Sequence, residues 1–144
     1  MSGTVTPRTL LRKHTEDVWN QGNLDAVEKY IAESYTEHDP SVHDELQGPE
    51  AYRRNVESFL TAFPDLEVTI EDSIVEGDKI AMRQRFQGTH TGEFVGIEPT
   101  GAEIDSTSFV ICRVEDDKIA ETWVETDMLG LLEQLGRDVR PDSG

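Results

Sequence analysis

The stretch Leu66-Glu67-Val68-Thr69-Ile70-Glu71 decides the fold class, because apolar and polar side chains alternate along it at every second position. This period is typical of a β-strand that has one face on the core and the other in water. Upstream, between Pro7 and Phe63, apolar residues recur at the three- and four-residue spacing of helices. The change of period near Leu66 predicts helices followed by strands, which is an α+β fold.

Three more strands and a short helix are predicted downstream. Glu76-Gly77-Asp78 and Asp116-Asp117 have the composition of tight turns between antiparallel strands. The predicted strands cover residues 79–87, 103–114 and 119–126, and the final helix covers residues 128–135. The predicted upstream helices begin after Thr6, at Leu24 and at Gly48, with a polar connector over residues 36–48. Helices packed into the concave face of such a sheet leave a pocket at its open end.

Length and charge restrict the function. A chain of 144 residues fits one domain, with a core over about residues 7–136 and a loose tail over residues 137–144. The formal charge of −17 excludes a general nucleic-acid binder and disfavours anionic membrane surfaces. No apolar run suggests a membrane span or a signal peptide, so we expect a cytoplasmic protein. The acidity predicts either adaptation to high salt or an acidic mesophilic protein.

Neither the cysteine nor the histidines predict a metal site. Cys112 is flanked by apolar residues and is interpreted as a small buried side chain in a strand. The histidines are His14, His38, His43 and His90. They lack the spacing of metal ligands, and the glycines of residues 88–101 lack the strand-to-helix context of a nucleotide loop. We therefore expect no metal and no cofactor.

The strongest candidate site lies at the end of the last predicted strand. The period-two spacing places Glu121, Trp123, Glu125 and Asp127 on one face. Carboxylates beside an aromatic ring on a concave face can have a raised pKa that suits proton transfer, and Arg113 could pair with Glu121. Asp127 has two interpretations, because it also precedes the final helix and could cap it.

Three residues of the helical half are further candidates. His38 and Asp39 precede Pro40 and either shape a turn or line the site. His14 falls on the inner face of the first helix, so it is either a half-buried histidine bonded to a neighbour or a polar group of the pocket. His90 lies in the glycine-rich loop and is expected to be exposed.

The order of motifs resembles that of SnoaL-like polyketide cyclases. Its most specific piece is Gly88-Thr89-His90-Thr91-Gly92-Glu93-Phe94, and the resemblance spans about residues 10–136. The other matching motifs are residues 19–25, 38–40, 48–50, 63–66, 96–101, 118–123 and 131–136, together with Asp127. The resemblance implies a nuclear-transport-factor-2-like fold, which is a cone-shaped α+β barrel with helices over a strongly curved antiparallel or mixed sheet. It also implies a homodimer.

The resemblance further implies cofactor-independent acid/base chemistry, such as aldol-type ring closure of a polyketide. Asp127 matches the family's acid/base aspartate, with His38, His14, Trp123, Glu121 and Asp39 as expected substrate-binding residues. Thr122 stands where the commoner family pattern has histidine, which removes a polar partner.

Other functions compete with this interpretation. Asp39 could be an isomerase base with His14 as oxyanion donor, or the protein could bind a small apolar metabolite without catalysis. An epoxide-hydrolase arrangement is disfavoured, because the strand around Asp105 lacks an adjacent arginine.

Overall fold

A computed structural model describes residues 5–41 and 44–137, so most of the predicted tail, residues 138–144, lies outside the described residues. The elements in chain order are α1 (Pro7–His14), a π-helical segment (Thr15–Asn20), a 3-10 turn (Leu24–Ala26), α2 (Val27–Tyr30), β1 (Ile31–His38), β2 (Leu46–Gln47), α3 (Gly48–Ala62), β3 (Glu67–Glu76), β4 (Lys79–Thr89), β5 (Glu103–Glu115), β6 (Lys118–Thr126) and α4 (Met128–Gln134).

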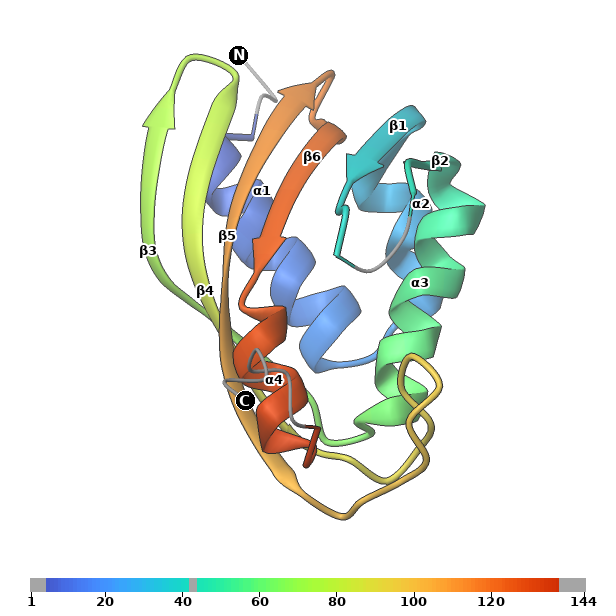
Figure 1. The fold of residues 1–144 in the computed structure, drawn as a ribbon. Coiled ribbons are helices and arrows are strands. Elements are labelled where there is room, and N and C mark those ends of the chain that lie inside the picture. Colours follow the sequence, from blue (N-terminus) through green and yellow to red (C-terminus); the bar gives the residue numbers. More distant parts are fainter. Residues whose placement is uncertain (1–4, 42–43, 138–144) are drawn as a thin grey trace.

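The strands form one mixed sheet in the order β2-β1-β6-β5-β4-β3. β1 runs parallel to β6, and every other neighbouring pair is antiparallel. Figure 1 shows the long strands bending around α1, with α3 on the same side and α4 following the end of β6. The predicted α+β fold, with helices packed on a curved sheet, is confirmed.

Local sequence explains the two main helices. The Thr6 side chain caps α1 by accepting a hydrogen bond from the Thr9 amide, and Pro7 takes the first helical position, where no amide hydrogen is needed. Tyr52 and Val56 of α3 are buried one turn apart on a single face, as the helical spacing predicts. Within the described residues no helix is both long and apolar enough to cross a membrane.

The strand β1 is the main departure from the prediction. The sequence suggested a helix through Ile31 and a polar connector from Thr36, whereas the helix ends at Tyr30 and residues 31–38 form a strand. A register shift between Ile31 and Thr36 interrupts the alternation of buried residues. β1 pairs on one side with the two-residue strand β2 and on the other with β6, which is more than eighty residues away. A long-range pairing therefore stabilises a strand that has no regular local pattern.

The loop between β4 and β5 is folded down onto the core. His90, which we expected to be exposed, is completely buried against Phe63, and its Nδ1 accepts a hydrogen bond from the Thr100 amide at 3.1 Å. Gly92 packs so closely on α3 that an added Cβ would lie 2.1 Å from the Thr61 carbonyl oxygen. The glycines here allow close backbone approach, which gives the loop a defined position over one end of the core.

Candidate active site

A cavity of about 120 Å³ lies between the concave face of the sheet and the helices. Its wall is mostly apolar, with side chains such as Leu11, Met82 and Val110 from α1, β4 and β5. The polar side chains that interrupt this wall come both from helices α1 and α3 and from strands β1, β4, β5 and β6. An apolar cavity with a few converging polar groups is the usual form of a small-molecule site.

Two carboxylates of β1 and its end face this cavity. Glu37 and Asp39 line it with exposed fractions of only 5% and 6%. The Tyr35 hydroxyl donates a 2.6 Å hydrogen bond to Glu37, and the Ser41 hydroxyl donates one of 3.0 Å to Asp39. Tyr35, Glu37 and Asp39 share the inner face because they are two residues apart along an extended backbone. Carboxylates are rarely buried this far unless function or pairing retains them.

A buried aromatic cluster stands on the helical side of the cavity. The Tyr52 oxygen lies 2.8 Å from His14 Nε2, and it accepts a 3.0 Å hydrogen bond from Trp19 Nε1. Burial lowers the pKa of His14 to about 4, although nearby Asp17 opposes the shift, so the imidazole is neutral at pH 7. Burial, reinforced by the Glu37 carboxylate, raises the pKa of Tyr52 well above its ordinary value, so the phenol keeps its proton.

The hydrogen-bond balance assigns the proton of His14. Its Nδ1 is buried without a hydrogen-bond partner among the described atoms. A buried N–H without an acceptor is less tolerable than a buried lone pair, so the proton is assigned to Nε2. His14 and Trp19 then both donate to the Tyr52 oxygen. The phenolic hydrogen of Tyr52, which lines the cavity, is left for a third acceptor.

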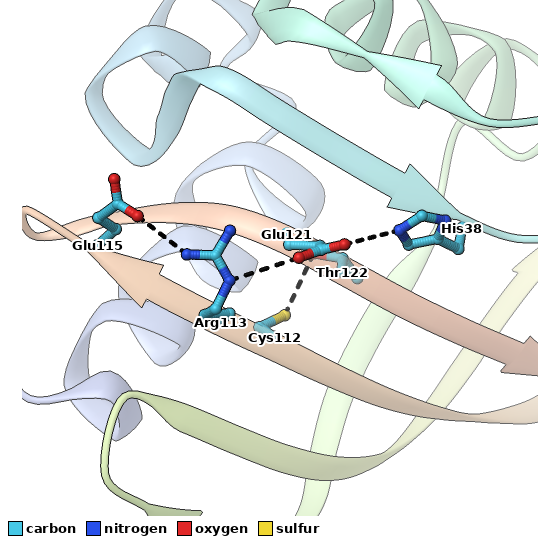
Figure 2. A network of polar contacts seen from close by, with 6 residues as sticks. All are labelled: His38, Cys112, Arg113, Glu115, Glu121 and Thr122. Atoms are coloured by element: carbon cyan, nitrogen blue, oxygen red, sulfur yellow. Dashed lines mark hydrogen bonds and ion pairs between the residues drawn. The ribbon is translucent and has the colours of Figure 1, made fainter.

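Of the residues predicted for the site, His14 and Asp39 line the cavity. His38, Glu121 and Trp123 do not, because they lie on the outer face of the sheet. The Glu121 carboxylate lies 2.8 Å from His38 Nε2 and accepts a 3.4 Å hydrogen bond from Arg113 Nε. These two partners hold the pKa of Glu121 below its ordinary value. Figure 2 shows this chain of contacts from His38 through Glu121 and Arg113 to Glu115.

The prediction about β6 was thus correct in its spacing and wrong in its face. Thr122, Val124 and Thr126 face the cavity, and cross-strand neighbours on β5 include Val110 opposite Val124. Placing Glu121 and Glu125 inward instead would bury two charges, which costs far more than burying threonine and valine. The side chain of Trp123 therefore lies on the outer face of the sheet. Its ring stacks there on the His38 ring, with a centroid distance of 5.5 Å.

Asp127 caps the final helix, which is the second of the two interpretations given for it above. Its carboxylate accepts a 3.0 Å hydrogen bond from the Gly130 amide and caps α4, and the residue is exposed. Asp127 is not part of the cavity wall, although its neighbours Thr126 and Met128 are. The acid/base role that the resemblance implies for it stays a prediction.

Three residues of the cavity wall, Tyr35, Glu37 and Tyr52, were not predicted from the sequence as site residues. Glu37 and Asp39 are polar like the residues between them, so the period of two is not visible in the sequence as an apolar–polar alternation. Residues 36–48 were predicted as a polar connector instead. Among residues 5–41 and 44–137, no group of three His, Cys, Asp or Glu side chains is placed to hold a metal ion.

Helices packed against a curved mixed sheet give the nuclear-transport-factor-2-like fold, and its apolar cavity with buried acids has the usual form of a small-molecule site. Residues 9–135 match the family described as SnoaL-like polyketide cyclase, and the chain belongs to this family.

Individual relatives agree with this assignment. The chain is 30% identical over 122 residues to aklanonic acid methyl ester cyclase AcmA of Streptomyces galilaeus, covering 83% of this chain and 84% of that protein. The structure of TsrD from Streptomyces laurentii is similar with a TM-score of 0.80 and 29% identity, covering 90% of this chain and 93% of that one. IdmH from Streptomyces antibioticus gives a TM-score of 0.80 at 28% identity, covering 92% of this chain and 100% of that one. Family and relatives together support a cyclase-type enzyme.

Proposed function

We propose that the protein closes a ring in a polyketide-like carbonyl compound by acid/base catalysis without a cofactor, with Glu37 as the base and Tyr52 as the proton donor. The observation that carries the proposal is that Glu37 lines the cavity while being only 5% exposed. The family and the relative named as a cyclase support ring closure as the reaction class.

The base step requires a carboxylate close to an activated carbon. Glu37 removes a proton from a carbon flanked by carbonyl groups, so the C–H bond breaks and an enolate forms. The Tyr35 hydroxyl, at 2.6 Å, fixes the orientation of the carboxylate. Burial raises the pKa of Tyr35 well above its ordinary value, so this phenol is a hydrogen-bond donor throughout the reaction. A fixed carboxylate in a mostly apolar cavity is exposed to little competing water.

The second step forms the ring. The enolate carbon attacks a ketone of the same molecule, and the new C–C bond leaves an alkoxide oxygen. Tyr52 supplies the stabilising hydrogen bond and then the proton, since His14 and Trp19 both donate to its oxygen and make the phenol a better donor. The proton taken up by Glu37 returns to Tyr52 through the product or through water, so the cycle needs no oxidant or reductant.

The test compares three acids in the same assay. Aklanonic acid methyl ester, the compound in the name of the AcmA relative, is the first substrate to try. Exchange of its acidic C–H in D2O, followed by NMR, reports the base step even where ring closure is slow. We expect Glu37→Gln to lower kcat and exchange by about 10²–10⁴-fold, while the outer-face control Glu125→Gln changes neither.

Asp39→Asn and Asp127→Asn complete the comparison. Under the proposal Asp39→Asn affects mainly KM, and Asp127→Asn leaves exchange within about twofold of wild type. If Asp127→Asn loses exchange while Glu37→Gln keeps full activity, the catalytic base is Asp127, as the family resemblance implies, and not Glu37. Loss in Asp39→Asn alone would favour the isomerase arrangement with His14 as donor.

A non-catalytic binding protein is the second candidate, and the helix-capping position of Asp127 favours it. Such a protein would bind the same ester, seen as a rise in melting temperature, without catalysing exchange or ring closure. Exchange above the buffer rate that is lost in Glu37→Gln would exclude this candidate.

We also propose that the protein works in the cytoplasm at high salt. A charge of −17 on 144 residues supports this, because self-repulsion of the folded chain weakens when ions screen it. The melting temperature should rise between about 0.05 and about 1 M KCl. A constant or falling melting temperature would favour the ordinary acidic protein instead.

A further inference from the structure

Some polar side chains of the cavity wall form no hydrogen bond with another group of the described residues. They are Gln84 of β4, Ser108 of β5, Thr126 of β6 and Asn55 of α3. Among the described residues, the side-chain polar atoms that are buried without a partner belong to histidines, so the polar atoms of these four side chains are open to the cavity. The chemistry proposed above uses none of them.

Strand register joins three of these side chains into a row across the concave face of the sheet. Gln84 pairs directly with Ser108, and Ser108 pairs directly with Thr126. Side chains that are directly opposed on neighbouring strands lie about 4.5–5.5 Å apart at Cβ, so the three can contact one ligand group together. Ser108 is only 6% exposed. A hydroxyl this far from bulk water costs free energy unless a bound water or a ligand group pairs with it.

The polar row lies at a defined separation from the buried carboxylate of β1. On β6, Thr126 is four residues beyond Thr122, and Thr122 pairs with Glu37. At about 3.3 Å per residue, this separation is about 13 Å along the strand. The wall between the two positions is apolar, with Val124 of β6 opposite Val110 of β5. A ligand that reaches both positions therefore has an apolar body with a polar group at each end.

The side chains of the row favour an uncharged oxygen group. Amides and hydroxyls both donate and accept hydrogen bonds, which suits a hydroxyl or a carbonyl. Within the described residues the cavity wall contains no lysine or arginine, and its carboxylates are Glu37 and Asp39. A ligand carboxylate here would lose its water without gaining a cation, so it is disfavoured. Asn55 lines the cavity from the helical side, about one turn along α3 from Tyr52, and adds a second amide.

We propose that Gln84, Ser108 and Thr126, together with Asn55, form a second subsite of the cavity, which holds an uncharged hydroxyl or carbonyl group of the substrate remote from the reacting carbon. The proposal rests on the proposed function for the position of the reacting end at Glu37. It extends that function by stating what the other end of the substrate carries and which side chains recognise it.

Two rigid probes that differ by one hydroxyl test the subsite. The probe 4-hydroxybiphenyl carries a hydroxyl at one end, and 4,4′-dihydroxybiphenyl carries one at each end. Both are uncharged at about pH 7, since phenols have a pKa of about 10. Neither has an exchangeable C–H bond or a ketone, so their binding is independent of catalysis. Equilibrium dialysis against up to about 300 µM of the full chain gives both dissociation constants.

We expect wild type to bind the dihydroxy probe about 5- to 20-fold more tightly, because its second hydroxyl makes one or two further hydrogen bonds. Its two equivalent orientations account for only about twofold of this ratio. In the double variant of Gln84→Leu and Ser108→Ala the ratio should fall to about twofold, with each single variant between.

Ser106→Ala is the matched control. Ser106 is also a buried serine of β5, 4% exposed, but its hydroxyl already donates a 3.2 Å hydrogen bond to the Asp127 carbonyl. This variant should therefore keep the wild-type ratio.

The outcomes that overturn the subsite differ from those that overturn the catalytic proposal. A wild-type ratio no greater than about twofold, or no binding of either probe, overturns the subsite. A ratio that survives the double variant, or that Ser106→Ala lowers as much, overturns it as well. Failure of the catalytic proposal appears instead as unchanged exchange in Glu37→Gln and leaves the probe ratio intact.

Discussion

The buried imidazole of His14 should make the stability of the protein depend on pH. In the native state burial lowers the pKa of His14 from 6.5 to about 4. Between these two values the unfolded chain takes up a proton at this position and the native state does not, so the free energy of unfolding falls as the pH falls. The stabilising contribution is fully present above pH 6.5 and is lost by about pH 4.

The size of the effect follows from the shift. Each pKa unit corresponds to about 1.4 kcal/mol, so a difference of about 2.5 units is worth about 3 kcal/mol in total. Most of this, about 2–3 kcal/mol, is lost between about pH 7.5 and about pH 4.5. For a domain with an ordinary stability of about 5–15 kcal/mol, that is a large fraction.

The assay is urea unfolding of wild type and His14→Asn across this pH range, because the variant cannot titrate here. At neutral pH the variant should be less stable by about 1–3 kcal/mol, since Tyr52 loses its partner. Toward pH 4.5 the difference should shrink by about 2–3 kcal/mol or change sign. Val56→Ala, a buried change with no titrating group, should keep a constant offset from wild type.

Titrating carboxylates affect all three proteins alike, so only the difference between wild type and variant matters. A difference between wild type and His14→Asn that is the same at both ends of the pH range would refute the assignment of a neutral, strongly desolvated imidazole. The proton placement that makes Tyr52 a donor would then lose its basis.

Three further changes test the local structure. Burial raises the pKa of the Cys112 thiol to about 12, so it should not react with a disulfide reagent at about pH 8 until urea unfolds the chain; rapid reaction of the native protein would contradict its placement. Gly92→Ala should destabilise by about 2 kcal/mol or more, measured by urea unfolding, because its Cβ would lie 2.1 Å from the Thr61 carbonyl oxygen. Asp127→Ala should cost about 1 kcal/mol by the same measurement and Asp127→Asn much less, since asparagine also caps a helix; equal losses would argue against the cap.

The sequence is informative about elements whose pattern is local. Strands β3 to β6 mostly alternate, and short polar turns join β3 to β4 and β5 to β6, so their positions follow from period and turn composition. Helices α1 and α3 have clear caps or glycine-proline starts and one apolar face. β1 has an interrupted alternation, and its neighbour along the chain, β2, is only two residues long. Its longer pairing is with β6, more than eighty residues away, and arises only when the whole sheet assembles. Such long-range pairing leaves no local signal.

The candidate site shows the same limit. Spacing can say that Glu121, Trp123 and Glu125 share a face, but not which face of the sheet becomes concave. That choice depends on where the helices pack, and the helices cover the side of Thr122 and Val124. His14 could be placed on the inner side from the first helix alone, because the helix has one apolar face. The orientation of a site residue could therefore be predicted where it depends on one helix or strand alone. It could not be predicted where it depends on how two elements pack together.

The alternation of β5 and β6 separates two properties of the protein within the same few residues. Val110, Cys112 and Thr122 face the cavity, while Phe109, Ile111 and Trp123 alternate with them on the outer face. A change of side chain on one face leaves the other face chemically intact, whereas a shift of register by one residue would exchange them. Both faces are apolar at this point, so apolar burial alone does not fix the register. The polar residues of β6 fix it, because its carboxylates stay outside the cavity while its threonines line the cavity wall. The same constraint that keeps the carboxylates of β6 out of the cavity therefore places Glu121 and Glu125 on the outer face of the sheet.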